Sequence, residues 1–275
     1  MLRNAVKAVA VAAFWGGMTG PAAAADAERL FDAVGMPRII EIMREEGLAY
    51  GETIRTDLLN GQGGQSWTDT VSAIYDADAM RAEMFDGFEA RLDGVDVEPL
   101  LEFFESDRGQ RIVEGEIAVR RAFLDEAVED AAKEALADLR ADNPDRYALL
   151  ETFVDANDLV ESNVMGAMNS NYAFYTGLMA GQAFDETLTE QQILSDVWSQ
   201  EDSIRADTEE WVYSYLGLAY DALSETDLEA YVALSRTDAG RSLNRALFGA
   251  FGAVFDDISF RLGEAAARFL VGQDI

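Results

Sequence analysis

The chain has 275 residues, of which 52 are acidic and 21 are basic, and none is His or Cys. This composition argues against zinc, haem and iron–sulfur sites and excludes Ser-His and Cys-His nucleophiles, so we expect no cofactor, no metal site and no catalytic residue. A net charge of −31 repels phosphate backbones and anionic lipid headgroups, which argues against nucleic-acid binding and electrostatic membrane docking. The simplest interpretation of the charge is a very soluble surface.

Residues 1–25 have the plan of a secretory signal peptide. Arg3 and Lys7 give a positive start, an apolar run covers residues 8–15, and small residues follow. The run is shorter than the roughly 20 residues that span a bilayer, which argues against a membrane anchor. We therefore expect export, to the periplasm, with a mature chain that starts at Ala25 or Asp26 and has no integral membrane segment.

Beyond this segment, apolar residues recur at helical spacing, and the alternation typical of strands is nearly absent. Val254, Ile258 and Leu262, for example, lie four residues apart on one helix face. The pattern predicts an all-α fold. Helices are expected over about 27–34, 36–60, 66–76, 78–93, 97–105, 107–140, 144–156, 158–181, 188–199, 201–222, 227–235 and 237–271.

The chain contains an internal repetition on either side of the sequence RADNPD at 140–145. Residues 96–112 resemble residues 227–243 in pattern, although few positions are identical. Both segments run from a short helix through a Ser/Thr-Asp-x-Gly corner into a long helix. We therefore interpret the chain as two tandem related multi-helix repeats, 26–142 and 143–275.

The repeated corner consists of Ser106, Asp107 and Gly109 in the first repeat and Thr237, Asp238 and Gly240 in the second. At this position the hydroxyl can cap the new helix, and the Asp favours the positive end of the helix dipole. Glycine costs about 1 kcal/mol relative to Ala inside a helix. Its recurrence predicts that the preceding helix crosses too closely for a Cβ, and the alternative is a backbone that faces a ligand.

The sequences LLEFFESDRGQRI (100–112) and YVALSRTDAGRSL (231–243) resemble the signature of the domain of unknown function 2059 family. ERLFDAVGM (28–36) is similar to the short first helix of that family of exported bacterial proteins. The resemblance covers about 27–140, with a degraded second copy over about 148–270. Asp107 and Asp238 stand where the family pattern has proline. The resemblance implies an exported all-α fold and supplies no activity, cofactor or catalytic residue.

A stretch rich in aromatic residues, NSNYAFYTGLMAGQ, covers residues 169–182. Its side chains Asn171, Tyr172, Tyr175 and Met179 are candidates for lining a cavity that holds an apolar or aromatic ligand. The alternative interpretation is a core segment with a polar edge.

Four acidic residues, Glu126, Asp130, Glu134 and Asp138, lie at a spacing of four on a predicted helix. Like charges at this spacing destabilise a helix by a few tenths of a kcal/mol per pair. One interpretation is a docking stripe for a cation or a basic partner, and the other is a solvated face.

These observations favour an exported, non-catalytic helical protein that acts as an interaction, chaperone-like or envelope-maintenance module with a protein partner. A second hypothesis is a carrier that holds a small apolar ligand between its helices. A third is a hydrolase that uses paired carboxylates, although acidic residues are too numerous for the sequence to single out one pair.

Overall fold

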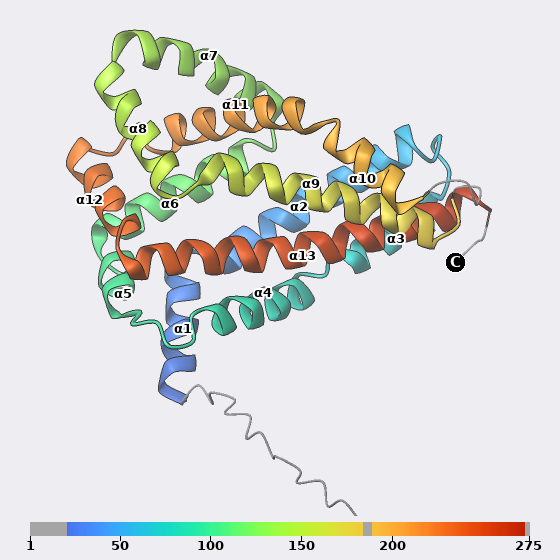
Figure 1. Ribbon diagram of the computed structural model, residues 1–275, viewed down its shortest axis with the longest axis horizontal. Helices are drawn as coiled ribbons and strands as arrows, with labels where there is room; N and C mark the ends of the chain where they lie inside the picture. The colour runs from blue at the N-terminus through green and yellow to red at the C-terminus, as the bar shows by residue number, and fades with distance from the viewer. Residues whose placement is uncertain (1–20, 184–188, 273–275) are drawn as a thin grey trace, which may run out of the picture.

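The structure is a computed structural model that describes residues 21–183 and 189–272 (Figure 1). Within these residues it has thirteen helices and no strand, which confirms the predicted all-α fold. The helices are α1 (Pro21–Ala33), α2 (Met36–Asp57), α3 (Gly64–Ile74), α4 (Ala77–Arg91), α5 (Glu98–Phe104), α6 (Asp107–Ala122), α7 (Glu126–Asp142), α8 (Pro144–Ala156), α9 (Leu159–Ala180), α10 (Glu190–Trp198), α11 (Glu201–Ala219), α12 (Glu225–Ser235) and α13 (Asp238–Leu270). In the described part of the chain, no helix combines the length and the hydropathy needed to cross a bilayer.

The predicted signal peptide lies mostly outside the described residues, and only its last five residues are seen, at the start of α1. From residue 24 onward, where the side chains of α1 are described, the first buried ones are Ala27, Leu30 and Phe31. A mature chain that starts at Ala25 or Asp26 therefore retains these core residues of α1.

The prediction of a single long helix over 107–140 is wrong, because the chain forms two helices there, α6 and α7. Asp125 adopts an extended backbone, and its carboxylate accepts a hydrogen bond from the Ala127 N–H at 3.0 Å. Arg120 and Arg121 occupy the last turn of α6, where positive charge suits the end of a helix. The first repeat thus has a 16-residue helix after its corner, whereas α13 has 33 residues.

The two corners have the same geometry. Ser106 Oγ accepts a hydrogen bond from the Gly109 N–H at 3.1 Å, and Thr237 Oγ1 accepts one from the Gly240 N–H at 2.9 Å. A Cβ on Gly109 would lie 2.2 Å from the Phe103 carbonyl oxygen, and one on Gly240 would lie 2.1 Å from the corresponding oxygen of Leu234. At both corners the glycine therefore lets the new helix pass against the backbone of the preceding helix.

The core draws on both halves of the chain. The largest cluster of buried residues combines side chains of α1 to α6 with a continuous stripe of α13 that includes Ala250, Val254 and Ile258. A second cluster joins α6 to α8, α11 and α12, and a third, smaller one lies between α9 and α10. Because α6 contributes to the first two clusters, it ties them together.

Helices α9 and α13 run side by side along most of the molecule (Figure 1). Gly177 of α9 faces the Phe260 carbonyl, and Gly263 of α13 faces the Phe174 carbonyl. A Cβ on either glycine would lie 2.1 Å from that oxygen. Glycine on both helices thus permits a close crossing at this point.

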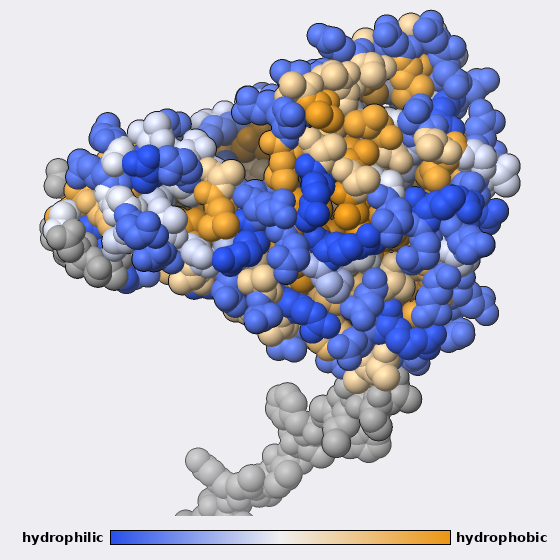
Figure 2. Space-filling model, turned by 180° about the vertical axis from the view of Figure 1, so that it is seen from behind, coloured by the Kyte–Doolittle hydropathy of each residue, from blue (hydrophilic) through white to orange (hydrophobic). Residues whose placement is uncertain are grey.

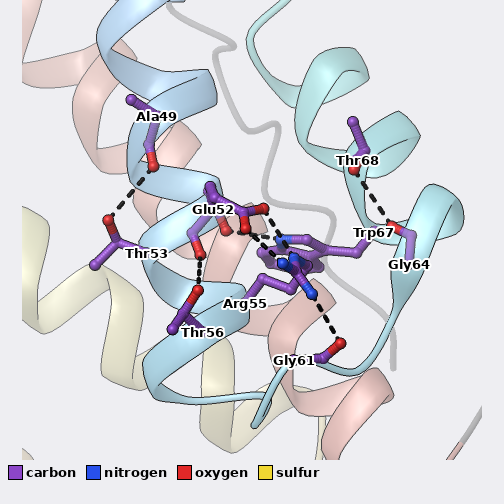
Figure 3. A network of polar contacts seen from close by, with 10 residues as sticks. Ala49, Glu52, Thr53, Arg55, Thr56, Gly61, Gly64, Trp67 and Thr68 are labelled. Carbon is purple, nitrogen blue, oxygen red and sulfur yellow. Dashed lines mark hydrogen bonds and ion pairs between the residues drawn. The ribbon is translucent and has the colours of Figure 1, made fainter.

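The turn between α2 and α3 is fixed by polar contacts (Figure 3). Arg55 donates to the Glu52 carboxylate at 2.8 Å and to the Gly61 carbonyl at 2.8 Å, which holds the loop against the end of α2. The buried Trp67 donates from its indole N–H to the Gly51 carbonyl at 2.8 Å. The connection lies earlier in the chain than the predicted helices 36–60 and 66–76 imply, because α2 ends at Asp57 and α3 already begins at Gly64.

The order of helices in the two halves is similar. Helices α1 and α8 have 13 residues each, and α2 and α9 have 22 residues each. Helix α6 packs on α11, and α13 packs on α4, so each long helix after a corner packs on a helix of the other half. Helix α13 also runs along α9 of its own half, so the long helices join the two halves, and the division into two related repeats stays a prediction.

Candidate binding cleft

An open cleft of about 630 Å³ lies where α7, α8, α9 and α11 meet. Its lining is mainly polar and contains two arginines, two tyrosines and five carboxylates. The lining residues are Arg140, Tyr147, Glu151, Val154, Asp155, Asp158, Leu159, Val160, Glu161, Arg205, Glu209 and Tyr213. Since the carboxylates outnumber the guanidinium groups by five to two, the cleft has a net charge of −3.

The wall formed by α8 is held in place at its first turn. Pro144 starts the helix, and the Asn143 side chain accepts a hydrogen bond from the Arg146 N–H at 3.3 Å. The Arg146 guanidinium reaches the end of α11, where it donates to the carbonyls of Tyr220 and Leu223, the latter at 3.0 Å. These contacts fix the direction of α8 relative to α11 and therefore the width of the cleft.

Two of the lining residues are stacked tyrosines. The rings of Tyr147 and Tyr213 have their centroids 5.6 Å apart and their planes inclined by 23°. Burial raises the pKa of Tyr213 to about 12, and the charges of Glu151, Asp155 and Glu209 add to the rise. Both tyrosines are therefore neutral at ordinary pH and present aromatic faces beside carboxylates.

The two arginines of the cleft have different surroundings. Arg205 forms ion pairs with Glu161 at 2.8 Å and Glu201 at 3.0 Å, and its hydrogen bonds to these two residues raise its pKa. Arg140 instead places its guanidinium carbon 5.2 Å from the centre of the Tyr147 ring. Such a position is a cation–π contact.

A second polar cluster, which we call the Glu116 cluster, lies half-buried between α6, α11 and α12. The Glu116 carboxylate accepts hydrogen bonds from Tyr220, at 2.5 Å, and from Tyr231, and its backbone carbonyl accepts one from Tyr215 at 2.8 Å. Burial raises the pKa of Glu116 to about 7, although the tyrosine hydrogen bonds oppose the rise. One turn further along α6, Arg120 pairs with Glu46 of α2 at 2.8 Å.

The acidic stripe predicted on the long helix lies on α7. All four of its carboxylates, from Glu126, Asp130, Glu134 and Asp138, are exposed. Lys133 lies among them and forms ion pairs with Glu129 at 2.7 Å and with Asp130 at 3.9 Å. The stripe does not contribute to the lining of the cleft, so its role as a docking surface stays a prediction.

The residues predicted to line a ligand cavity lie on α9. Tyr172, Tyr175 and Met179 pack against the cluster between α9 and α10, and the Tyr172 hydroxyl donates to Glu190 at 2.5 Å. Asn171 is half-buried beside them. The structure thus brings these four residues together on one helix, with three of them in core packing, and the cleft is lined by other side chains.

Sequence reasoning missed both the tyrosine pair and Glu116. Tyr147, Glu151 and Asp155 are four residues apart, so they form one polar face of a predicted helix, which could have indicated the wall of the cleft. Glu116 follows the buried Ile112 by four residues, so both lie on the same face of the helix. A carboxylate on such an apolar face could have indicated the Glu116 cluster. In the described residues, no group of three or more His, Cys, Asp or Glu side chains is placed to hold a metal ion.

Fold and cleft together define an all-helical protein with an acidic, aromatic cleft. Residues 78–138 match the family described as uncharacterized protein conserved in bacteria (DUF2059). The match extends from α4 into α7 and includes the first corner, so it confirms the resemblance over this part of the chain. Neither a curated protein nor a solved structure matches the chain. The degraded second copy over about 148–270 stays a prediction.

Proposed function

We propose that the chain is an exported, non-catalytic interaction module of the bacterial envelope that holds a segment of a partner protein in the cleft between α7, α8, α9 and α11. The observation that carries this proposal is the cleft itself, whose size of about 630 Å³ suits several side chains of an extended segment. Its stacked tyrosines supply rigid contact area, and its charged rim supplies directional contacts.

A binding role fits the placement of the titratable groups better than hydrolysis by paired carboxylates. Such a hydrolase needs an acid that keeps its proton near neutral pH beside a second, ionised carboxylate. The carboxyl group with a pKa of about 7 is Glu116, and it is enclosed by Tyr220 and Tyr231 outside the cleft. This placement supports the proposal of a binding role.

The carrier hypothesis is supported by a different observation. Seen from behind, the molecule is mostly hydrophilic but is hollowed between its narrow end and its broader part, and hydrophobic side chains line the hollow (Figure 2). Native mass spectrometry of protein purified from its own host tests this alternative. A retained small molecule would favour the carrier, and bare protein would favour the interaction module.

Export and partner binding are tested in living cells. The intact mass of protein from a periplasmic extract should correspond to a chain that starts at Ala25 or Asp26, and full-length protein in the membrane pellet would contradict export.

A photo-crosslinking amino acid in place of Tyr213 should yield a discrete protein adduct. The same group in place of Tyr50, which is 50% exposed on α2, should not. No adduct at Tyr213, or equal adducts at both positions, would overturn the proposed binding site.

A further inference from the structure

We infer that the segment bound in the cleft is basic, and that it places an arginine side chain on the Tyr147–Tyr213 pair between the carboxylates of Glu151, Asp155 and Glu209. This inference rests on the proposed function, since it names the chemistry of the partner that the cleft holds.

The charge of the cleft is the first argument. Arg205 is already neutralised by Glu161 and Glu201 at ion-pair distances of 2.8 and 3.0 Å. The carboxylates around the tyrosine pair belong to α8 and α11, and they lie close enough to Tyr213 to raise its pKa. A cation that entered the cleft would therefore meet carboxylates from two walls, and an anion would be repelled.

The position of Arg140 is the second argument, and it is independent of the acidic charge. The chain places its own guanidinium over Tyr147, with 5.2 Å between the guanidinium carbon and the ring centre. Within the described residues, Arg140 forms no ion pair, and its side chain is exposed. The aromatic face of the cleft is thus already shaped for a guanidinium group, and an exposed side chain of α7 occupies it.

Arg140 therefore acts as an internal competitor for the bound segment. An incoming arginine must displace the Arg140 guanidinium from Tyr147 or share the tyrosine pair with a like charge. Removal of the Arg140 charge should consequently strengthen binding of a basic peptide. A cation–π contact at an exposed site corresponds to a change in affinity of about two- to fivefold.

The experiment measures binding of a fluorescent tetra-arginine peptide by anisotropy at about 0.15 M salt, where surface charges are largely screened. Arg140→Gln should tighten binding by about two- to fivefold. Arg91→Gln is the matched control, because it removes the same charge from α4, outside the cleft. Tyr147→Leu should weaken binding, and Tyr147→Phe, which keeps the ring, should retain it.

A second comparison separates the cleft from the general acidity of the protein. The triple variant Glu151→Gln, Asp155→Asn, Glu209→Gln should weaken peptide binding at least tenfold. A control triple variant, Glu41→Gln, Asp57→Asn, Asp86→Asn, changes exposed acids of α2 and α4 and should leave it nearly unchanged.

Three results would overturn the inference: no peptide binding, equal effects of the two triple variants, or an Arg140→Gln variant that binds no more tightly than Arg91→Gln. If the peptide does not bind but the Tyr213 position still yields its adduct in cells, the proposed function stands, and the inference that the bound segment is basic is wrong. If the peptide binds as expected but no adduct forms, the chemistry of the cleft stands and the proposed function is wrong.

Discussion

At the scale of single residues, the corner glycines Gly109 and Gly240 are the clearest case of a residue type that the geometry requires. Each faces a backbone carbonyl across a distance that a methyl group cannot occupy, 2.2 and 2.1 Å from the expected Cβ position. A backbone atom cannot move aside as a flexible side chain can. The repetition in the sequence therefore records a steric requirement of two equivalent helix crossings.

Substitution of either corner glycine should destabilise the protein. Gly109→Ala and Gly240→Ala should each lower the free energy of unfolding by about 1–3 kcal/mol, because the helices must separate to admit the methyl group. Gly166→Ala on α9 is the control. No atom lies within 4 Å of its Cβ position, so the change should stabilise by about 0.5–1 kcal/mol. Urea unfolding measures all three, and equal effects would contradict the steric account.

Glu116 should make stability depend on pH. The unfolded carboxyl loses its proton near its ordinary pKa of 4.5, whereas the folded one keeps its proton up to about pH 7. Between these values the folded state binds more protons, so this contribution to stability falls as pH rises and is constant above about pH 7. Over this range the contribution of Glu116 to the free energy of unfolding falls by about 3 kcal/mol in total.

The variant Glu116→Gln should remove this loss. Its unfolding free energy relative to the wild type should rise between pH 4.5 and 7.5, since the amide does not ionise. Glu114→Gln on the same helix is the control: because Arg38 lowers the pKa of Glu114 through a hydrogen bond, its effect has the opposite sign and lies below about pH 4.5, so between pH 4.5 and 7.5 its profile should run parallel to that of the wild type. Parallel pH profiles for wild type and Glu116→Gln would show that the carboxyl is not protonated in the fold.

At the scale of elements, periodicity predicted most helices, and it failed where two helices share one pattern. The apolar spacing continues through residues 123–125, so nothing in it separates α6 from α7. The break depends on the extended backbone of Asp125, which the sequence indicates only by a residue type that favours helix caps. The sequence could indicate one polar wall of the cleft, on α8, but not the cleft itself, since Tyr147 and Tyr213 belong to different helices whose packing is not encoded locally.

The cap at the start of α7 is open to a direct test. Asp125→Ala removes the acceptor for the Ala127 N–H and should cost about 1 kcal/mol of stability. Glu134→Ala in the exposed interior of α7 should be neutral or stabilising, because it relieves repulsion within the acidic stripe. Thermal unfolding compares the two variants, and an unchanged melting temperature for Asp125→Ala would favour one continuous helix.

At the scale of the whole molecule, the two predicted repeats share a core. The stripe of α13 from Leu243 to Leu262 lies in the same cluster as buried residues of α1 to α5. Helix α6 of the first half in turn supplies Ile112 and Val119 to the cluster of α8, α11 and α12. The boundary at 142/143 is therefore a division of the sequence, whereas the packing joins the two segments.

Separate halves should not fold. A fragment of residues 26–142 lacks the α13 stripe and should show no cooperative unfolding transition, and a fragment of residues 143–275 should behave in the same way. Mixing or co-expression of the two should restore helicity and a single transition, because each supplies the helix that the other lacks. A cooperative transition in either fragment alone would contradict the shared core.

The central claim is that the cleft between α7, α8, α9 and α11 binds a basic segment through its tyrosine pair. A ¹H–¹⁵N NMR titration with the tetra-arginine peptide tests it most directly. The account predicts saturable shifts at amides near Tyr147, Glu151 and Tyr213, with α2 and α4 unaffected. Shifts spread over the acidic surface without saturation, or confined to another face of the molecule, would contradict it.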